Sequence, residues 1–197
     1  MRPAGEKAMR VLATIVLLIP NIYIFGGANA IYDGSGDGAV AFAFVLAVCE
    51  FFLATLAHEA GHAVAATYFG WQVELFAVTP IAWRRKTRRF EFWLKMGADF
   101  GGAVYCRSGN DRRKLALLHL AGPLANFALT LVLAILFVAA ALILRPYSAV
   151  PGALMISLAG VSFFMGIGNL IPFRARNGNR SDGANLAMLL RRRPRYP

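Results

Sequence analysis

Four long apolar stretches restrict the fold of this chain more than any other feature of the sequence. They run over residues 11–27, 39–57, 115–144 and 149–172. Because a helix rises about 1.5 Å per residue, each stretch approaches or exceeds the length that crosses a hydrocarbon core of about 30 Å. The chain is 58% hydrophobic and only 16% charged, whereas soluble domains carry about 25% charged residues. We therefore expect an all-α membrane protein with about four transmembrane helices.

The basic residues predict how these helices are oriented. Three lie in residues 1–10, ten in residues 71–114 and seven after Pro172, while residues 26–38 contain none. Lys and Arg accumulate in cytosolic loops, so both termini and the 71–114 segment are expected in the cytosol. The cluster at 84–89 is expected to face anionic lipid headgroups, and no nucleic acid partner is expected. This indicates a multi-pass protein of a bacterial inner or plasma membrane.

The sequence divides into three parts. Residues 1–38 hold the first span and an external loop, although the basic start and the motif Ala-Asn-Ala at 28–30 also fit a cleaved signal peptide. We favour an uncleaved helix, because the apolar stretch is longer than a usual signal core. Residues 39–190 form the core, with spans at 39–69, 115–144 and 149–172, and residues 191–197 form a basic cytosolic tail.

The segment at 71–106 differs in kind from the apolar runs around it. Residues 71–75 and 90–96 approximate the alternation of a β-strand and are rich in aromatic and β-branched side chains. A third strand is expected at 103–106. We predict a small β-hairpin or sheet at the cytosolic interface, with an edge strand that could pair with an extended peptide.

The second span ends in the motif H-E-x-x-H, formed by His58, Glu59 and His62. Residues i and i+4 share one face of a helix, so the two imidazoles can bind one zinc ion. Zinc lowers the pKa of a water molecule to about 7, and Glu59 can accept the proton of that water. Histidines that are satisfied by chance are the alternative, but unpartnered polar groups are costly in an apolar span.

Zinc requires a further protein ligand, and four residues are candidates. Glu74 and Glu91 lie in the strand-like segment, and His119 lies at the start of the third span. Asp182 is the only acid after Asp111, and it follows a span that ends on the same side of the membrane as the histidines. The topology therefore favours Asp182 without excluding the others. Ser181, Asp182 and Gly183 also resemble a cap that opens a short helix through Leu190.

Taken together, the motifs resemble the site-2 protease family of intramembrane zinc metalloproteases. Besides H-E-x-x-H, the chain has Ala-Gly-Pro-Leu-Ala-Asn at 121–126 and an N-x-x-P…D-G element that starts at Asn169. The family usually places four residues between the proline and the aspartate, whereas here there are nine, at 173–181. The resemblance implies zinc ligands, a general base and two substrate-binding residues: His58, His62 and Asp182; Glu59; Asn126 and Asn169.

The two asparagines can also be interpreted without the resemblance to the family. A transmembrane substrate must unwind before cleavage, and side-chain amides can bond to the groups that unwinding frees. For each of Asn126 and Asn169 the alternative is a hydrogen bond between helices. Glu50, two turns before His58, is expected to be protonated or hydrogen-bonded to another span.

These observations predict a zinc-dependent intramembrane endopeptidase. Its expected partners are a transmembrane protein or peptide substrate and the lipid bilayer, and its site is expected toward the cytosolic side. The alternative is a non-catalytic zinc-binding scaffold or metal-handling protein of the membrane. Glu59 favours the enzyme, because metal binding alone does not require a base beside the first histidine.

Overall fold

The computed structural model describes residues 5, 8, 9, 11, 12, 37–92, 101–143, 149–175 and 178–191. The predicted first span and its signal-peptide alternative therefore lie almost wholly outside the described residues, as does the tail after Arg191. The remaining predicted elements can be compared with the structure.

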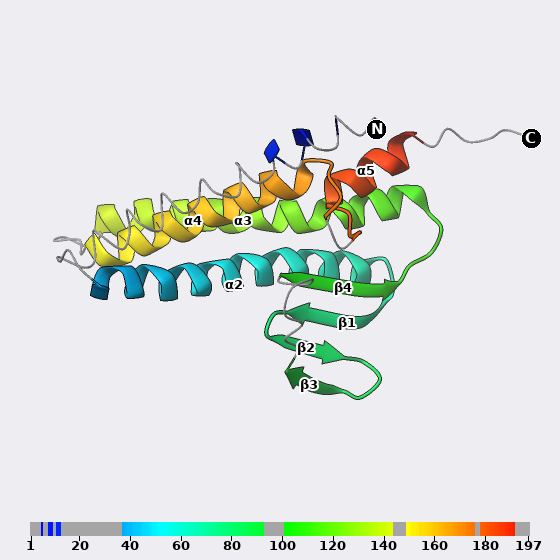
Figure 1. The fold of residues 1–197 in the computed structure, drawn as a ribbon, viewed down its shortest axis with the longest axis horizontal. Coiled ribbons are helices and arrows are strands. Elements are labelled where there is room, and N and C mark those ends of the chain that lie inside the picture. Colours follow the sequence, from blue (N-terminus) through cyan, green and yellow to red (C-terminus); the bar gives the residue numbers. More distant parts are fainter. Residues whose placement is uncertain are drawn as a thin grey trace, which may run out of the picture.

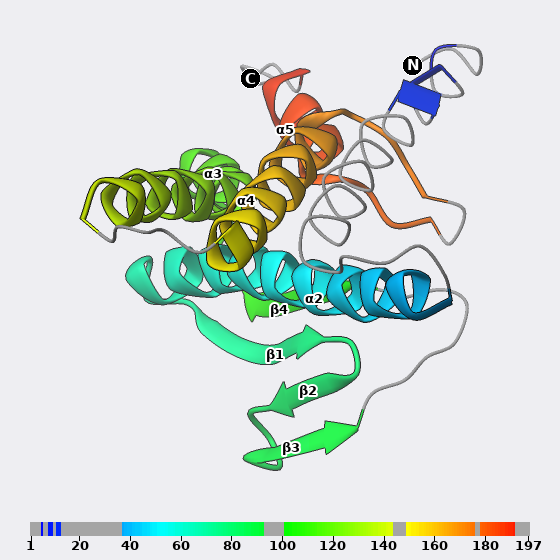
Figure 2. The ribbon, with the colours of Figure 1, turned by 90° about the vertical axis from the view of Figure 1, so that its left-hand side faces the viewer.

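Three long helices form the body of the structure. They are α2 (Asp37–Tyr68), α3 (Arg112–Ile143) and α4 (Ala149–Leu170), and they lie side by side in Figures 1 and 2. Each contains a segment long and apolar enough to cross a membrane: Val40–Tyr68, Arg112–Ile143 and Val150–Leu170. These segments agree with the three spans predicted for the core.

The outer faces of the helices are apolar, which is the reverse of a soluble bundle. Phe44 on α2 is 70% exposed and Leu142 on α3 is 68% exposed. Large apolar areas of this kind need a lipid or protein environment. The fold is therefore that of a helical membrane protein.

Small residues let these helices approach closely. A methyl group on Gly61 would overlap the carbonyl of Ala121 on α3, and one on Gly166 of α4 would lie 2.8 Å from Cε1 of Phe127.

Buried polar pairs also link the spans. Ser157 Oγ of α4 donates to Oε2 of Glu50 at 2.9 Å, which confirms a hydrogen bond between Glu50 and another span.

A four-stranded antiparallel sheet follows α2. Its strands are β1 (Gln72–Val78), β2 (Ile81–Arg84), β3 (Arg89–Phe92) and β4 (Gly102–Arg107), in the order β3-β2-β1-β4. The prediction missed β2, because Pro80 and the basic cluster suggested a break. Pro80 instead lies in the turn between β1 and β2, and the cluster lies around the turn between β2 and β3. Residues 93–96, which were predicted to continue β3, lie outside the described residues.

The sheet and the last helix lie at one end of the bundle. Figure 1 shows β4 as the strand nearest to α2, and α5 (Asp182–Arg191) beside α3 at the same end. Ser181 caps α5, because its Oγ accepts a hydrogen bond from the backbone N–H of Ala184 at 3.2 Å. The predicted short helix after Ser181 is thus confirmed, and Asp182 is its first residue.

Candidate metal centre and active site

The two histidines of the motif project from one face of α2, one turn apart. Their Nε2 atoms lie 3.2 Å from each other. The opposite ring nitrogen of His62, Nδ1, lies 2.7 Å from the backbone carbonyl oxygen of Leu118 on α3. A carbonyl oxygen only accepts hydrogen bonds, so Nδ1 of His62 carries the proton and Nε2 of the neutral ring presents its lone pair.

His58 is oriented by a side chain rather than by the backbone. Its Nδ1 lies 2.8 Å from Oδ1 of Asn126 on α3. The amide nitrogen of Asn126 points the other way, 3.2 Å from the carbonyl oxygen of Ala54 and 3.2 Å from Oγ of Ser162. Asn126 is fully buried.

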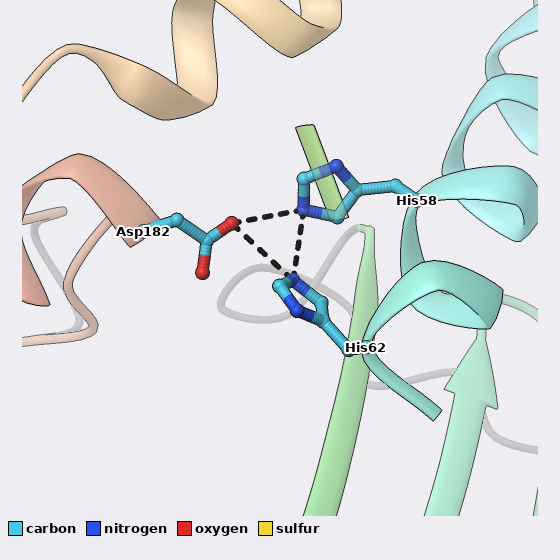
Figure 3. A group of neighbouring side chains, drawn as sticks. All are labelled: His58, His62 and Asp182. Atoms are coloured by element: carbon cyan, nitrogen blue, oxygen red, sulfur yellow. Dashed lines mark hydrogen bonds and ion pairs between the residues drawn. The ribbon is translucent and has the colours of Figure 1, made fainter. Parts of the chain in front are cut away.

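Asp182 reaches the histidines from the opposite side. Figure 3 shows its carboxylate pointing at both rings from the start of α5. Its Oδ2 lies 3.0 Å from Nε2 of His58 and 3.3 Å from Nε2 of His62. The structure thus brings together the three residues that were predicted as ligands.

The long connection between Pro172 and Asp182 does not displace the aspartate, because the described residues on either side of 176–177 are hydrogen-bonded to each other and close a loop. Ser181 Oγ donates to the carbonyl of Ile171 at 2.7 Å, and the backbone N–H of Ser181 donates to the carbonyl of Phe173 at 3.1 Å. Arg174 and Arg180 face each other in an antiparallel bridge. The loop therefore accommodates the extra residues, and the chain returns to the end of α4 at Ser181.

A glycine allows the chain to return this close to the end of α4. A methyl group on Gly183 would overlap the carbonyl of Leu170, the last residue of α4. The start of α5 consequently lies directly against the end of α4. This contact determines how far Asp182 reaches toward the histidines.

His119 contacts the outer oxygen of the same carboxylate. Its Nδ1 lies 3.2 Å from Oδ1 of Asp182, whereas the histidines of the motif contact Oδ2. Burial raises the pKa of the Asp182 carboxyl, but the contacts with His119, His58 and His62 lower it by more, so this pKa lies well below its usual range. Asp182 is therefore ionised, as a metal ligand must be.

The dimensions and chemistry of this group fit a zinc ion. Four ligands at about 2.0–2.1 Å from zinc lie about 3.3 Å from each other in a tetrahedron, and the three atoms here are separated by 3.0, 3.2 and 3.3 Å. Two imidazole lone pairs and a carboxylate all accept, so either a proton or a cation must lie between them. His58, His62 and Asp182 would hold the metal.

Glu59 lies beside this group without belonging to it. Its residue is only 7% exposed, and its carboxylate has no hydrogen-bond partner among the described residues. The backbone of Gly102 on β4 lies against it so closely that a methyl group there would be 2.6 Å from Oε1 of Glu59. The carboxylate is thus confined near the metal ligands and is free to accept a proton.

The three candidate ligands, Glu59 and His119 border one cavity of about 610 Å³. Its walls come from α2, β4, α3, the end of α4 and α5, and they include His58, Glu59, His62, Tyr105, Asn169 and Asp182. This volume is in the range of ligand-binding pockets. Asn169 donates to the carbonyl of Met165 at 3.1 Å and remains half-exposed, so it can also face a ligand.

Asn126 was predicted to contact substrate, but it is not part of the cavity wall. Its Oδ1 and Nδ2 bond to His58, Ala54 and Ser162, and no part of it is exposed. A substrate cannot reach it in this arrangement. Its surroundings match the alternative reading, a hydrogen bond between helices.

The two glutamates considered as ligands lie elsewhere. Oε2 of Glu91 on β3 accepts from Nε of Arg84 at 2.9 Å, and Oε1 of Glu74 on β1 accepts from Nε of Arg107 at 2.9 Å. Both are surface ion pairs of the sheet. Among the described residues, the group of metal-binding side chains found is His58, His62 and Asp182.

The fold and the site define the class as a helical membrane protein with a candidate metal centre of the H-E-x-x-H type. The model of peptidase family M50 matches residues 42–150, which is more than half of the 197-residue chain, and the chain belongs to this family, the site-2 protease family. No curated protein and no solved structure matches the chain. The family match ends before Asn169 and Asp182, so the structure alone brings these two residues to the site.

Proposed function

We propose that this protein is a zinc-dependent intramembrane endopeptidase that hydrolyses peptide bonds within or beside transmembrane segments. The observation that carries the proposal is the placement of Glu59 at the same cavity as the converging atoms of His58, His62 and Asp182. When bound, zinc supplies Lewis-acid activation of the scissile carbonyl and of the attacking water. Metal binding without catalysis would not require Glu59.

The protein's own residues would divide the remaining tasks. Glu59 accepts the proton of the attacking water and then donates it to the leaving amine, as a general base and acid. Asn169, on the cavity wall, offers its amide to the substrate backbone. Glu59 lies on α2 and Asn169 lies at the end of α4, so these two helices determine the positions of both groups.

An extended substrate segment could bind along β4. This strand is at the edge of the sheet, and its residues 102–105 line the cavity. An edge strand has one row of backbone N–H and C=O groups without a strand partner, and these can pair with an unwound peptide. A transmembrane helix that unwinds beside β4 would regain there the hydrogen bonds that it loses.

The turn between β2 and β3 supports contact with the lipid surface. Phe90 and Phe92 on β3 are 76% and 77% exposed. The basic cluster lies in the same hairpin: Arg84, Arg85, Lys86, Arg88 and Arg89. Aromatic and basic side chains together are typical of the membrane interface, where anionic headgroups attract the cations. This supports a site on the cytosolic side of a multi-pass membrane protein.

The test replaces the base and leaves the ligands intact. Cells that make Glu59→Gln should lose the membrane-protein fragments that wild-type cells produce, as measured by quantitative proteomics. The purified variant should still contain about one zinc per chain. Glu50→Gln is the matched control, because Glu50 is a buried glutamate of the same helix that bonds to Ser157 outside the cavity. Equal fragments from wild type and Glu59→Gln would refute the proposal.

A further inference from the structure

The position of Asn126 is not explained by a role as a metal ligand or by direct contact with a substrate. Asn126 contributes no atom to the metal group and no surface to the cavity, although it is a polar residue in the middle of an apolar helix. Burying an amide is costly unless its groups are hydrogen-bonded. All three of its hydrogen-bonded neighbours, His58, Ala54 and Ser162, belong to other spans.

The surrounding acceptors determine which way the amide points. The carbonyl oxygen of Ala54 can only accept, so the atom 3.2 Å from it must be the nitrogen of Asn126. Ser162 Oγ donates to the backbone carbonyl of Asn126 at 3.0 Å and is therefore free to accept from the same amide nitrogen. The oxygen Oδ1 must then face His58.

An acceptor at this place selects one form of the imidazole. Oδ1 has no hydrogen to donate, so the bond of 2.8 Å requires that Nδ1 of His58 carries the proton. In the neutral ring, Nε2 then has a free lone pair, whereas in the opposite tautomer Nε2 would donate its proton to Asp182, 3.0 Å away. A neutral histidine with the proton on Nε2 could not bind a metal through that atom.

We propose that Asn126 is a positioning residue that keeps His58 in its Nδ1–H form, and that it thereby determines the zinc affinity of the site. Hydrogen bonds to the far nitrogen of a metal-binding histidine orient the ring and select its tautomer. His62 is held in the same form by a backbone carbonyl, which no substitution of a side chain removes. His58 is therefore the histidine whose form depends on a side chain.

The first measurement reads the tautomer directly. The chain has three histidines, so the ¹⁵N imidazole spectrum of the metal-free protein in detergent, at a pH where the rings are neutral, contains only three rings to assign. The spectra are recorded in an Asp182→Ala background, because the carboxylate 3.0 Å from Nε2 of His58 is a competing acceptor for the ring proton in the metal-free protein. With Asn126 present, His58 and His62 should then carry the proton on Nδ1. Asn126→Leu should shift His58 toward the Nε2–H form and leave His62 unchanged, which makes His62 an internal control for an intact site.

The second measurement is the zinc affinity of the corresponding proteins that retain Asp182, determined by competition with a chelator. Asn126→Leu should bind zinc about 10- to 100-fold more weakly than wild type. Asn126→Asp keeps an oxygen opposite Nδ1, and its other oxygen, protonated in this buried position, can donate to the carbonyl of Ala54 as the amide nitrogen does. This variant should retain both the tautomer and the affinity. Thr130→Val is the control for packing, because Thr130 Oγ1 bonds only to the backbone carbonyls of Asn126 and Ala159, and it should behave as wild type.

Two results would overturn the proposal. One is an Asn126→Leu protein that either keeps His58 in the Nδ1–H form or binds zinc with wild-type affinity. The other is loss of the tautomer or of affinity in Asn126→Asp. If Asn126→Leu does not fold, His62 also loses its preference, and Asn126→Asp alone decides. Neither measurement involves a substrate, so its failure is distinct from a failure of the proposed protease activity.

Discussion

Oδ2 of Asp182 lies 3.0 Å from Nε2 of His58, although 124 residues separate them in the chain. The contact joins the start of α5 to the middle of α2 and depends on the closed loop before Ser181. A carboxylate at this distance completes a set of three ligands with His62. The candidate metal site is therefore assembled by the tertiary fold from two distant segments.

Replacement of the third ligand should remove the metal. We expect Asp182→Asn to lose most of its zinc, measured by mass spectrometry, because a neutral amide neither binds the ion well nor offsets its charge. Glu91→Gln is the control and should keep its zinc, since Glu91 pairs with Arg84 on the sheet. Zinc retained in Asp182→Asn but lost in Glu91→Gln would move the site to the sheet.

His119→Gln tests whether His119 supports the carboxylate of Asp182 or is itself a metal ligand. His119 contacts Oδ1 of Asp182 and not the face of the carboxylate that points at the other histidines. We expect this variant to bind about one zinc per chain with a weaker affinity, because it loses only the support of the ligand. Complete loss of zinc at saturating metal would show that His119 is itself a ligand.

Gly122 should tolerate no side chain, because the imidazoles occupy the space beside it. A methyl group there would lie 2.7 Å from Nε2 of His58 and would overlap the ring of His62. We expect Gly122→Ala to lower the zinc affinity by at least about 10-fold, measured by chelator competition. The reason is that both rings must move away from the geometry that matches the ion.

The control for Gly122→Ala is Gly166→Ala. The added methyl group of this variant also crowds a contact between helices, but the contact is with Phe127 and lies away from the metal ligands. Overpacking of this kind costs about 1–3 kcal/mol, so its melting temperature in detergent should fall while its zinc affinity stays the same. Equal zinc affinity in the two variants would contradict the position assigned to the histidine rings.

The pair formed by Ser157 and Glu50 should matter for stability and not for zinc. Oε1 of Glu50 has no hydrogen-bond partner among the described residues, and Oε2 accepts from Ser157. Ser157→Ala leaves a buried carboxyl without this bond, so we expect a loss of about 1–3 kcal/mol, seen as a lower melting temperature. Thr55→Val should change it little, since Thr55 makes only a long contact of 3.9 Å with the sulfur of Met165.

The orientation in the membrane rests on the distribution of Lys and Arg and can be tested by labelling. The two native cysteines are replaced first, and single cysteines are introduced as Ser35→Cys and Thr87→Cys. An impermeant thiol reagent should label position 35 in intact cells and should label position 87 only after lysis, because the basic segment is expected in the cytosol. The reverse pattern would invert the proposed topology.

Local chemistry was enough to predict much of this protein. Apolar length predicted the three described spans, and the spacing of His58 and His62 predicted their shared face, since neighbours four apart in a helix are adjacent whatever surrounds them. Ser181 predicted the start of α5 because capping involves only the first turn. The nine residues between Pro172 and Asp182 depart from the usual spacing of the family, and the sequence could not reveal the closed loop that returns the aspartate to the site.

Only the tertiary structure decided the surroundings of Asn126 and the position of β2. Helical periodicity says which residues share a face, but it does not determine how far each helix is rotated or shifted against its neighbours. That rotation turns Asn126 toward His58 and Ser162 and leaves Asn169 at the cavity. The strand Ile81–Arg84 likewise exists because β1 and β3 pair with it on both sides, and such cross-strand partners are not visible in the residues of the strand itself.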